Sequence, residues 1–95
     1  MSAPTVQHLA DENRYEFRDG EAHAILTYQH EGDRIVYDHT FVPVDFRGQG
    51  VAAKLVEAAL ADARKENLTV IPQCSYVATY IARHSQHQDL LSTRS

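Results

Sequence analysis

The sequence has 95 residues, which is the length of one domain with one modest core. Hydrophobic residues make up 43% of it and charged residues 23%, which excludes a disordered or fibrous chain, and no apolar run approaches the ~20 residues of a membrane span. The net charge of −4 is unevenly placed: nine acidic residues stand against three arginines between His8 and Asp45, which argues against nucleic acid as a main partner.

Three strand-like segments fill the first half of the chain, at residues 13–18, 21–30 and 34–42. In the first of them Tyr15 and Phe17 alternate with charged side chains, which is the period of a strand. Asp19-Gly20 and residues 31–33 are short turn signals, so the three strands are predicted to form an antiparallel meander. Pro43 ends the third strand because proline cannot donate to a sheet.

The second half of the chain changes to the period of a helix. Between Gly48 and Asn67 the apolar residues recur at helical spacing. A short apolar run at 68–71 predicts a buried strand, which a helical crossover places parallel to the third strand. We expect Ser75 to cap a final helix whose apolar face carries Val77, Tyr80, Ile81 and His84, and residues 88–95 to add a turn and fray.

These elements predict an α/β fold with a mixed, mostly antiparallel sheet of four or five strands, one long helix and a short C-terminal helix. Residues 1–12 are expected to be a flexible N-terminus, 13–91 the single domain and 92–95 a tail. Residues 1–5 lack the basic start and apolar stretch of a signal peptide, and the one cysteine excludes an internal disulfide, so we expect a cytoplasmic protein with no membrane partner.

A glycine-rich segment at 42–52 joins the third strand to the long helix. Gly48 and Gly50 stand at the start of this helix, where the first backbone N–H groups have no internal acceptor and the dipole is positive. Arg47 adds a cation there, so the segment could bind a pyrophosphate. It fits neither a P-loop nor a dinucleotide fingerprint, and a glycine-rich turn that simply begins a helix is the alternative.

The motif Arg47-Gly48-Gln49-Gly50-Val51-Ala52 resembles the Gln/Arg-x-x-Gly-x-Gly/Ala loop of the GNAT superfamily of N-acetyltransferases. Segments 39–42, 72–77 and 80–84 are similar to those of very short GNAT-like proteins, and the resemblance covers residues 13–91. It implies an acetyl-CoA-binding N-acetyltransferase that transfers acetyl to an amine. The cofactor-binding residues it implies are Val42, Val44, Arg47, Gly48, Gln49, Gly50, Val51 and Ala52, together with Arg83, which could instead be merely solvated.

The sequence departs from larger members of that superfamily between the first two strands of the meander. Those members carry two helices there that shape the acceptor pocket, and Asp19-Gly20 leaves no room for them. A shallow, open acceptor site is therefore expected, suited to a protein or peptide amine. A CoA-binding or protein-interaction module with little or no turnover is the alternative. An open edge of the meander would permit a monomer or a weak dimer.

Cys74 follows the last strand, at the sheet edge where ligands of α/β proteins collect. The thiol could act as a nucleophile, as a general acid or base, or only in packing; the resemblance to the short GNAT-like proteins favours catalysis. His39 is a second candidate, expected to share a strand face with Tyr37 and Phe41, although a structural role is the simpler interpretation.

The histidines near the C-terminus are interpreted as structural. His84, His87 and Asp89 lack the paired ligand spacing of a zinc site and Cys74 has no partner cysteine, so no metal is predicted. Tyr76 and Tyr80 are expected in the core rather than against a cofactor.

Overall fold

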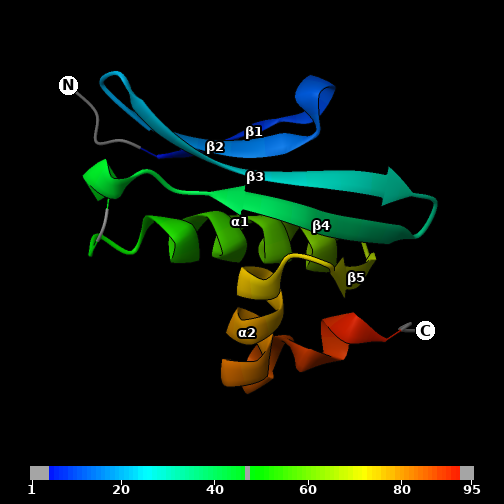
Figure 1. Cartoon of the computed structure of the whole chain (residues 1–95). Coiled ribbons are helices and arrows are strands. Elements are labelled where there is room, and N and C mark those ends of the chain that lie inside the picture. The colour runs from blue at the N-terminus through cyan, green and yellow to red at the C-terminus, as the bar shows by residue number, and fades with distance from the viewer. Residues whose placement is uncertain (1–4, 47, 93–95) are drawn as a thin grey trace.

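The computed structural model of the chain describes residues 5–46 and 48–92. In this part of the chain a five-stranded sheet has the order β1-β2-β3-β4-β5, and helices α1 (Val51–Lys65) and α2 (Ser75–Arg83) lie below the sheet (Figure 1). The predicted mixed, mostly antiparallel fold is confirmed. Within the described ranges, neither helix has the length and apolar character needed to cross a membrane.

The antiparallel meander consists of β2 (Arg14–Asp19), β3 (Ala22–Glu31) and β4 (Arg34–Phe41), each within two residues of its predicted limits. The turns between them contain Gly20 and Gly32, whose φ values of +66° and +63° lie in the left-handed region that glycine adopts without strain. The direct β2–β3 turn leaves no room for inserted helices, as the sequence predicted.

The structure gives residues 6–12 regular secondary structure, where the sequence predicted a flexible segment 1–12. Strand β1 (Val6–Leu9) pairs antiparallel with β2, and a 3₁₀ turn, η1 (Ala10–Glu12), connects the two. The ring of His8 stacks on Tyr15 at 4.3 Å between centroids, and this contact helps hold the short strand in place. The domain therefore begins before residue 13, whereas residues 1–4 and 93–95 lie outside the described part.

Helix α1 contributes six buried residues to the core beneath the sheet. Its buried residues are Val51, Leu55, Val56, Ala59, Leu60 and Ala63. The small alanines let the helix approach the sheet closely, and the fully buried Tyr37 of β4 donates a hydrogen bond of 2.8 Å to the carbonyl oxygen of Ala59. Arg64 and Lys65 in the last turn complement the negative end of the helix dipole.

Strand β5 (Thr69–Pro72) pairs in parallel with the first half of β4, as the helical crossover predicted. The paired residues of β4 run from Arg34 to Tyr37, and the last contact is the 2.8 Å hydrogen bond from the N–H of Cys74 to the carbonyl oxygen of Tyr37. Beyond this point β4 continues and β5 does not, so the second half of β4 has an edge without a β5 partner.

A β-bulge marks the same point of β4. Tyr37 is opposite Tyr28 and His39 is opposite Thr27, which leaves Asp38 as the extra residue. The carboxylate of Asp38 accepts hydrogen bonds from the side chains of Thr27 and Gln29 on the neighbouring strand. The bulge interrupts the alternation of faces along β4.

The C-terminal segment is more ordered than the sequence predicted. Helix α2 begins at Ser75 with Cys74 as its N-cap, so the predicted cap at Ser75 is one residue too late, and His84 lies just after the helix. A 3₁₀ segment, η3 (Ser85–Leu91), follows; it begins three residues before the turn predicted from residue 88 and buries Leu90 against the core.

Candidate functional site

The glycine-rich loop meets the first turn of α1 at one end of the sheet. Gly48 and Gly50 have φ values of +80° and +69°, and Gly50 is the N-cap of α1 without a side-chain cap. The first helical hydrogen bond runs from the N–H of Lys54 to the carbonyl oxygen of Gly50, so the N–H groups of residues 51–53 precede it at the positive helix end. This is the geometry of an anion-binding helix start.

The space beside these glycines is open. A Cβ atom placed on Gly48 or Gly50 would meet no protein atom within 4 Å, so packing within the protein does not require glycine there. Gln49 is oriented by two contacts, from its backbone N–H to the carbonyl of Phe46 and from its side chain to the carbonyl of Asp45 at 3.1 Å. The two Gln49 contacts thus fix the loop to the preceding turn, and the open space beside Gly48 and Gly50 is accessible to a ligand.

The remaining residues predicted to bind the cofactor differ in how exposed they are. Val51 is buried with its side chain in the core, so only its backbone faces the helix start, and Ala52 is half-buried in the first turn. Val42 packs half-buried against the core just after β4, and Val44 is exposed in the 3₁₀ turn η2 (Val44–Phe46). Arg47 lies outside the described residues.

Cys74 lies at the point where β4 and β5 part. Its thiol sulfur is 3.2 Å from the hydroxyl oxygen of Thr40, a residue on the second half of β4, and the residue is half-buried. Burial opposes ionisation, but hydrogen bonds from the Thr40 hydroxyl and from backbone N–H groups of Val77, Tyr76 and Thr40 lower the pKa of the Cys74 thiol below its ordinary value. The N-cap position on α2 contributes to this lower pKa, because the Tyr76 and Val77 N–H groups belong to the first turn of the helix.

His39 takes a different position from the one predicted. Because Asp38 is an extra residue in the bulge, Tyr37 points into the core beneath the sheet whereas His39 is exposed, opposite Thr27. The expectation that His39 shares a face with Tyr37 is wrong. Thr40, which the sequence analysis did not select, is the β4 side chain that contacts the thiol.

A groove of about 330 Å³ runs between the first turns of α1 and helix α2. Its lining residues are Ala53, Tyr76, Thr79, Tyr80, Arg83 and His84. Tyr76 and Tyr80 are half-buried and pack against the core, as expected, and they also line this groove. Arg83 is exposed on the groove, where its cation is available to an anionic ligand.

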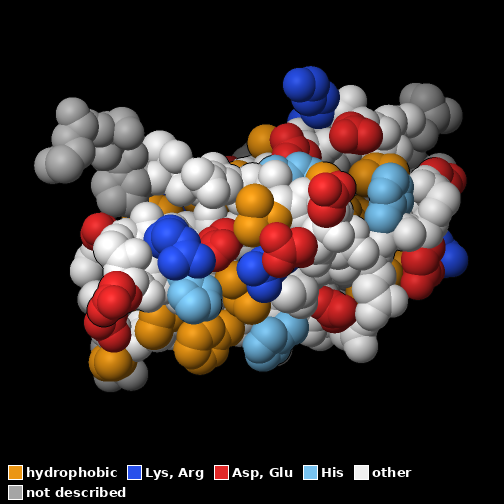
Figure 2. Space-filling model, turned by 90° about the horizontal axis from the view of Figure 1, so that it is seen from above, with side chains coloured by type: hydrophobic (Ala, Val, Ile, Leu, Met, Phe, Trp, Pro, Cys, Tyr) orange, Lys and Arg blue, Asp and Glu red, His pale blue; other side chains and the backbone are white. Residues whose placement is uncertain are grey.

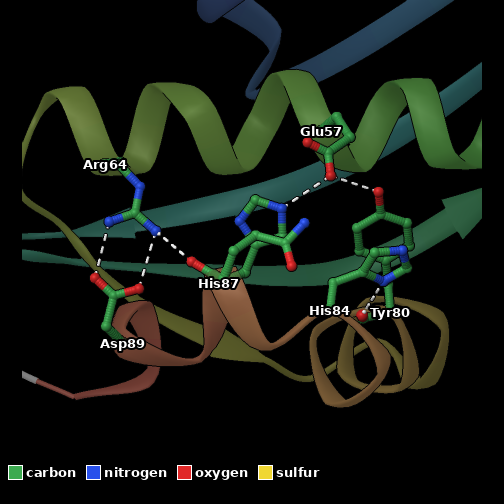
Figure 3. Close-up of polar contacts among 7 residues, drawn as sticks. Glu57, Arg64, Tyr80, His84, His87 and Asp89 are labelled. Atoms are coloured by element: carbon green, nitrogen blue, oxygen red, sulfur yellow. Dashed lines mark hydrogen bonds and ion pairs between the residues drawn. The ribbon is translucent and has the colours of Figure 1, made fainter.

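A polar network behind this groove fixes the position of Tyr80 (Figure 3). The Tyr80 hydroxyl and His87 Nε2 both contact the Oε1 atom of Glu57 on α1, the latter at 2.8 Å. The ring of His84 stacks on Tyr80 at 3.9 Å between centroids, and its Nδ1 lies 2.7 Å from the Tyr80 carbonyl oxygen. Burial and the hydrogen bond to Glu57 raise the pKa of Tyr80 to about 12, so its hydroxyl stays protonated near neutral pH.

A second set of contacts, centred on Arg64, joins η3 to α1 and engages Asp89. Arg64 of α1 makes two hydrogen bonds, of 2.8 and 2.9 Å, to the Asp89 carboxylate and one to the Gln86 carbonyl (Figure 3). These contacts hold η3 against α1. In the described part of the chain, no group of three His, Cys, Asp or Glu residues is arranged to hold a metal ion.

One end of the sheet thus combines a helix start with N–H groups ahead of its first hydrogen bond, a strand edge that β5 does not cover, and a thiol. A groove lined by two tyrosines and one arginine lies beside α1. The mixed five-stranded sheet and this loop define the class of N-acetyltransferase folds. The family model of GCN5-related N-acetyltransferases matches residues 14–90, and the chain belongs to this family.

Relatives and a solved structure agree with that assignment. The chain is 34% identical to Protein NATD1 of Mus musculus over 90% of its own length and 80% of the relative, and 32% identical to Protein NATD1 of Xenopus tropicalis over 94% and 84%. The solution structure of a GCN5-like protein from Staphylococcus aureus superimposes with a TM-score of 0.78 at 32% identity, covering 100% of this chain and 94% of that one.

Proposed function

We propose that the chain binds acetyl-CoA at the open end of the sheet and transfers its acetyl group to an amine. The observation that carries this proposal is the position of one thiol, one unpaired strand edge and one anion-binding helix start at the same end of the sheet. The site suits a long ligand with a pyrophosphate at one point and a thioester at another.

The pyrophosphate is assigned to the start of α1. Backbone N–H groups of Val51 and Ala52 would donate to it, and Gly48 and Gly50 would permit its close approach. Gln49 and Arg47 belong to the same loop, and Arg83 on the adjacent groove would add a cation. The pantetheine chain would extend along the unpaired edge near Val42 and Val44, toward Thr40 and Cys74.

Cys74 is assigned the chemical step. Its thiolate would attack the thioester carbonyl, forming an acetyl-cysteine as the bond to the CoA sulfur breaks, and the CoA thiolate would leave and take up a proton. A neutral amine would then attack the acetyl-cysteine, regenerating the Cys74 thiolate while the amine nitrogen loses a proton. In the second route the amine attacks acetyl-CoA directly and Cys74 donates a proton to the departing CoA thiolate.

The acceptor is proposed to be an amine of a protein or peptide, in the cytoplasm. The direct turn from β2 to β3 leaves the acceptor side without covering helices, so a small free amine would have few contacts there. The same feature favours a second candidate, a CoA-binding or protein-interaction module with little turnover. Release of CoA thiol that depends on an added amine distinguishes the enzyme from the module.

The binding proposal is tested by calorimetry with acetyl-CoA on Gly50→Val and a matched variant, Gly32→Val. Both glycines have φ values near +65° and open space at the Cβ position, so both substitutions cost a similar ~1–2 kcal/mol of backbone strain. Only the Cβ at residue 50 would occupy the space assigned to pyrophosphate. We expect more than tenfold weaker binding, about 1.4 kcal/mol, for Gly50→Val alone. Equal affinities of the two variants and the parent would defeat the assignment.

A further inference from the structure

A second hollow, of about 300 Å³, lies at the end of the sheet where β3 begins and β4 ends. It is lined by Glu21, Ala22, His23, Phe41, Pro43 and Asp45. Phe41, the large apolar side chain of this hollow, is 49% exposed, and Ala22 and Pro43 lie beside it. A contiguous apolar patch with polar residues at its rim marks a surface that contacts a partner.

The hollow is close to the candidate thiol along the chain. Phe41 directly follows Thr40, whose hydroxyl is 3.2 Å from the Cys74 sulfur. Successive side chains of a strand point to opposite faces, so Phe41 lies on the outer face while Thr40 lies on the face that meets Cys74. The thiol and the hollow therefore lie on the two faces of one strand end, where β4 has no β5 partner.

The rim of the hollow is acidic. Neither the Glu21 nor the Asp45 side chain has an ion pair within the described ranges, and both are exposed. The half of the chain that builds this face, from His8 to Asp45, holds nine acidic residues against three arginines. Figure 2 views the molecule from above the sheet and shows hydrophobic side chains gathered at one end, with acidic, basic and histidine side chains beside them.

We propose that this hollow docks the acceptor, and that the acceptor is a peptide segment carrying a lysine next to an apolar residue. The apolar residue would pack on Phe41 and Pro43, and the positive charge near the lysine would be attracted by Glu21 and Asp45. The peptide would approach from the outer face, opposite the helix-side groove assigned to the cofactor. This inference rests on the proposed acetyl transfer and adds the location and chemistry of the acceptor surface.

The charge arm of the test uses two glutamates that flank the same strand. Glu21 precedes β3 at the hollow and Glu31 ends β3 at the far end of the sheet, so Glu21→Lys and Glu31→Lys change the net charge equally. The probe is a short peptide with blocked termini and one lysine beside a leucine. We expect Glu21→Lys to raise its Kd, followed by NMR titration, about fivefold and Glu31→Lys to leave it unchanged.

The apolar arm compares two exposed hydrophobic residues. Phe41→Ala removes the largest apolar side chain that lines the hollow. Leu91→Ala removes a side chain of similar exposure, 43%, in η3. We expect Phe41→Ala to raise the peptide Kd about tenfold, because it removes apolar area from the docked surface, and Leu91→Ala to have no effect. Acetyl-CoA affinity, measured by calorimetry, should be the same in Glu21→Lys, Glu31→Lys and Leu91→Ala.

The readouts separate this inference from the proposed function. Peptide-induced shifts at residues 21–23 and 41–45 that Glu21→Lys and Phe41→Ala weaken support the docking surface, even in a protein that turns over slowly. Shifts elsewhere, absent binding, or equal effects of test and control variants overturn it. If the docking surface is overturned while acetyl-CoA binding is still lost in Gly50→Val alone, the proposed function is retained without this acceptor surface.

Discussion

The two halves of β4 have the same neighbour on one side and different neighbours on the other. From Arg34 to Tyr37 the strand lies between β3 and β5, and Tyr37 is completely buried. From Asp38 to Phe41 it pairs with β3 alone, and its other edge faces the region of Cys74. One strand therefore serves as core at its start and as candidate binding edge at its end.

The bulge at Asp38 is the boundary between these halves. A β-bulge bends its strand and increases the local twist, which helps β4 diverge from β5. The Asp38 carboxylate is held by Thr27 at 2.5 Å and Gln29 at 3.2 Å, so the irregularity is stabilised by side chains of β3. The comparison predicts that substitutions in the first half change stability and those around the second half change function.

The largest effect is expected at Cys74, beside the second half of the strand. Cys74→Ala and Cys74→Ser should bind acetyl-CoA like the parent and lose two to four orders of magnitude in transfer rate, on the order typical of a removed catalytic group. Intact-mass measurement after incubation with acetyl-CoA alone separates the routes: a gain of one acetyl group at Cys74 supports the covalent one. Parent-like turnover of Cys74→Ala would assign the cysteine to packing.

Tyr37 in the first half should affect stability instead. Tyr37→Ala removes a fully buried ring and its hydrogen bond to Ala59, and we expect the free energy of unfolding in urea to fall by about 3–5 kcal/mol. His39 lies two residues further along β4, in its second half, and its side chain is exposed. His39→Ala should therefore change the free energy of unfolding by less than ~0.5 kcal/mol. Equal losses at the two positions would contradict the division of β4. Tyr37→Phe, which keeps the ring, should cost about 1 kcal/mol.

A smaller effect is expected at Thr40. Thr40→Val removes the hydroxyl that stabilises the thiolate, so the pKa of Cys74 should rise and less thiolate should be present at a given pH. Alkylation of Cys74 by iodoacetamide at pH 7 should slow about fivefold, because one hydrogen bond contributes roughly 1 kcal/mol. Thr69→Val, on β5, is the matched control and should alkylate at the parent rate.

The sequence was sufficient for the meander, for α1 and for the parallel pairing of β5, because their periods and turn residues are local signals. Strand β1 was missed because it is four residues long and only its two end residues are half-buried, so it carries no apolar alternation. Its order depends on pairing with β2 and on the stacking of His8 upon Tyr15, which are contacts distant in sequence.

In the candidate site, too, local features could be predicted from the sequence and contacts between distant residues could not. The glycine loop and the position of Cys74 after the last strand could be predicted, since both are short patterns next to clear elements. The contact of Cys74 with Thr40 joins residues 34 positions apart, and the bulge that turns His39 outward adds one residue that no periodicity reveals. The groove beside Tyr80 likewise requires Glu57 and His87 to come together from separate elements.

The most direct test of the division of β4 is an NMR titration of the protein with acetyl-CoA, followed at every backbone amide. Shifts are predicted at residues 38–42, along the loop to Ala52 and around Cys74, with little change at residues 34–37, where both edges of β4 are occupied. Shifts concentrated at 34–37, or a titration that leaves residues 42–52 unchanged, would contradict the assignment of the open half of β4 and its loop as the acetyl-CoA site.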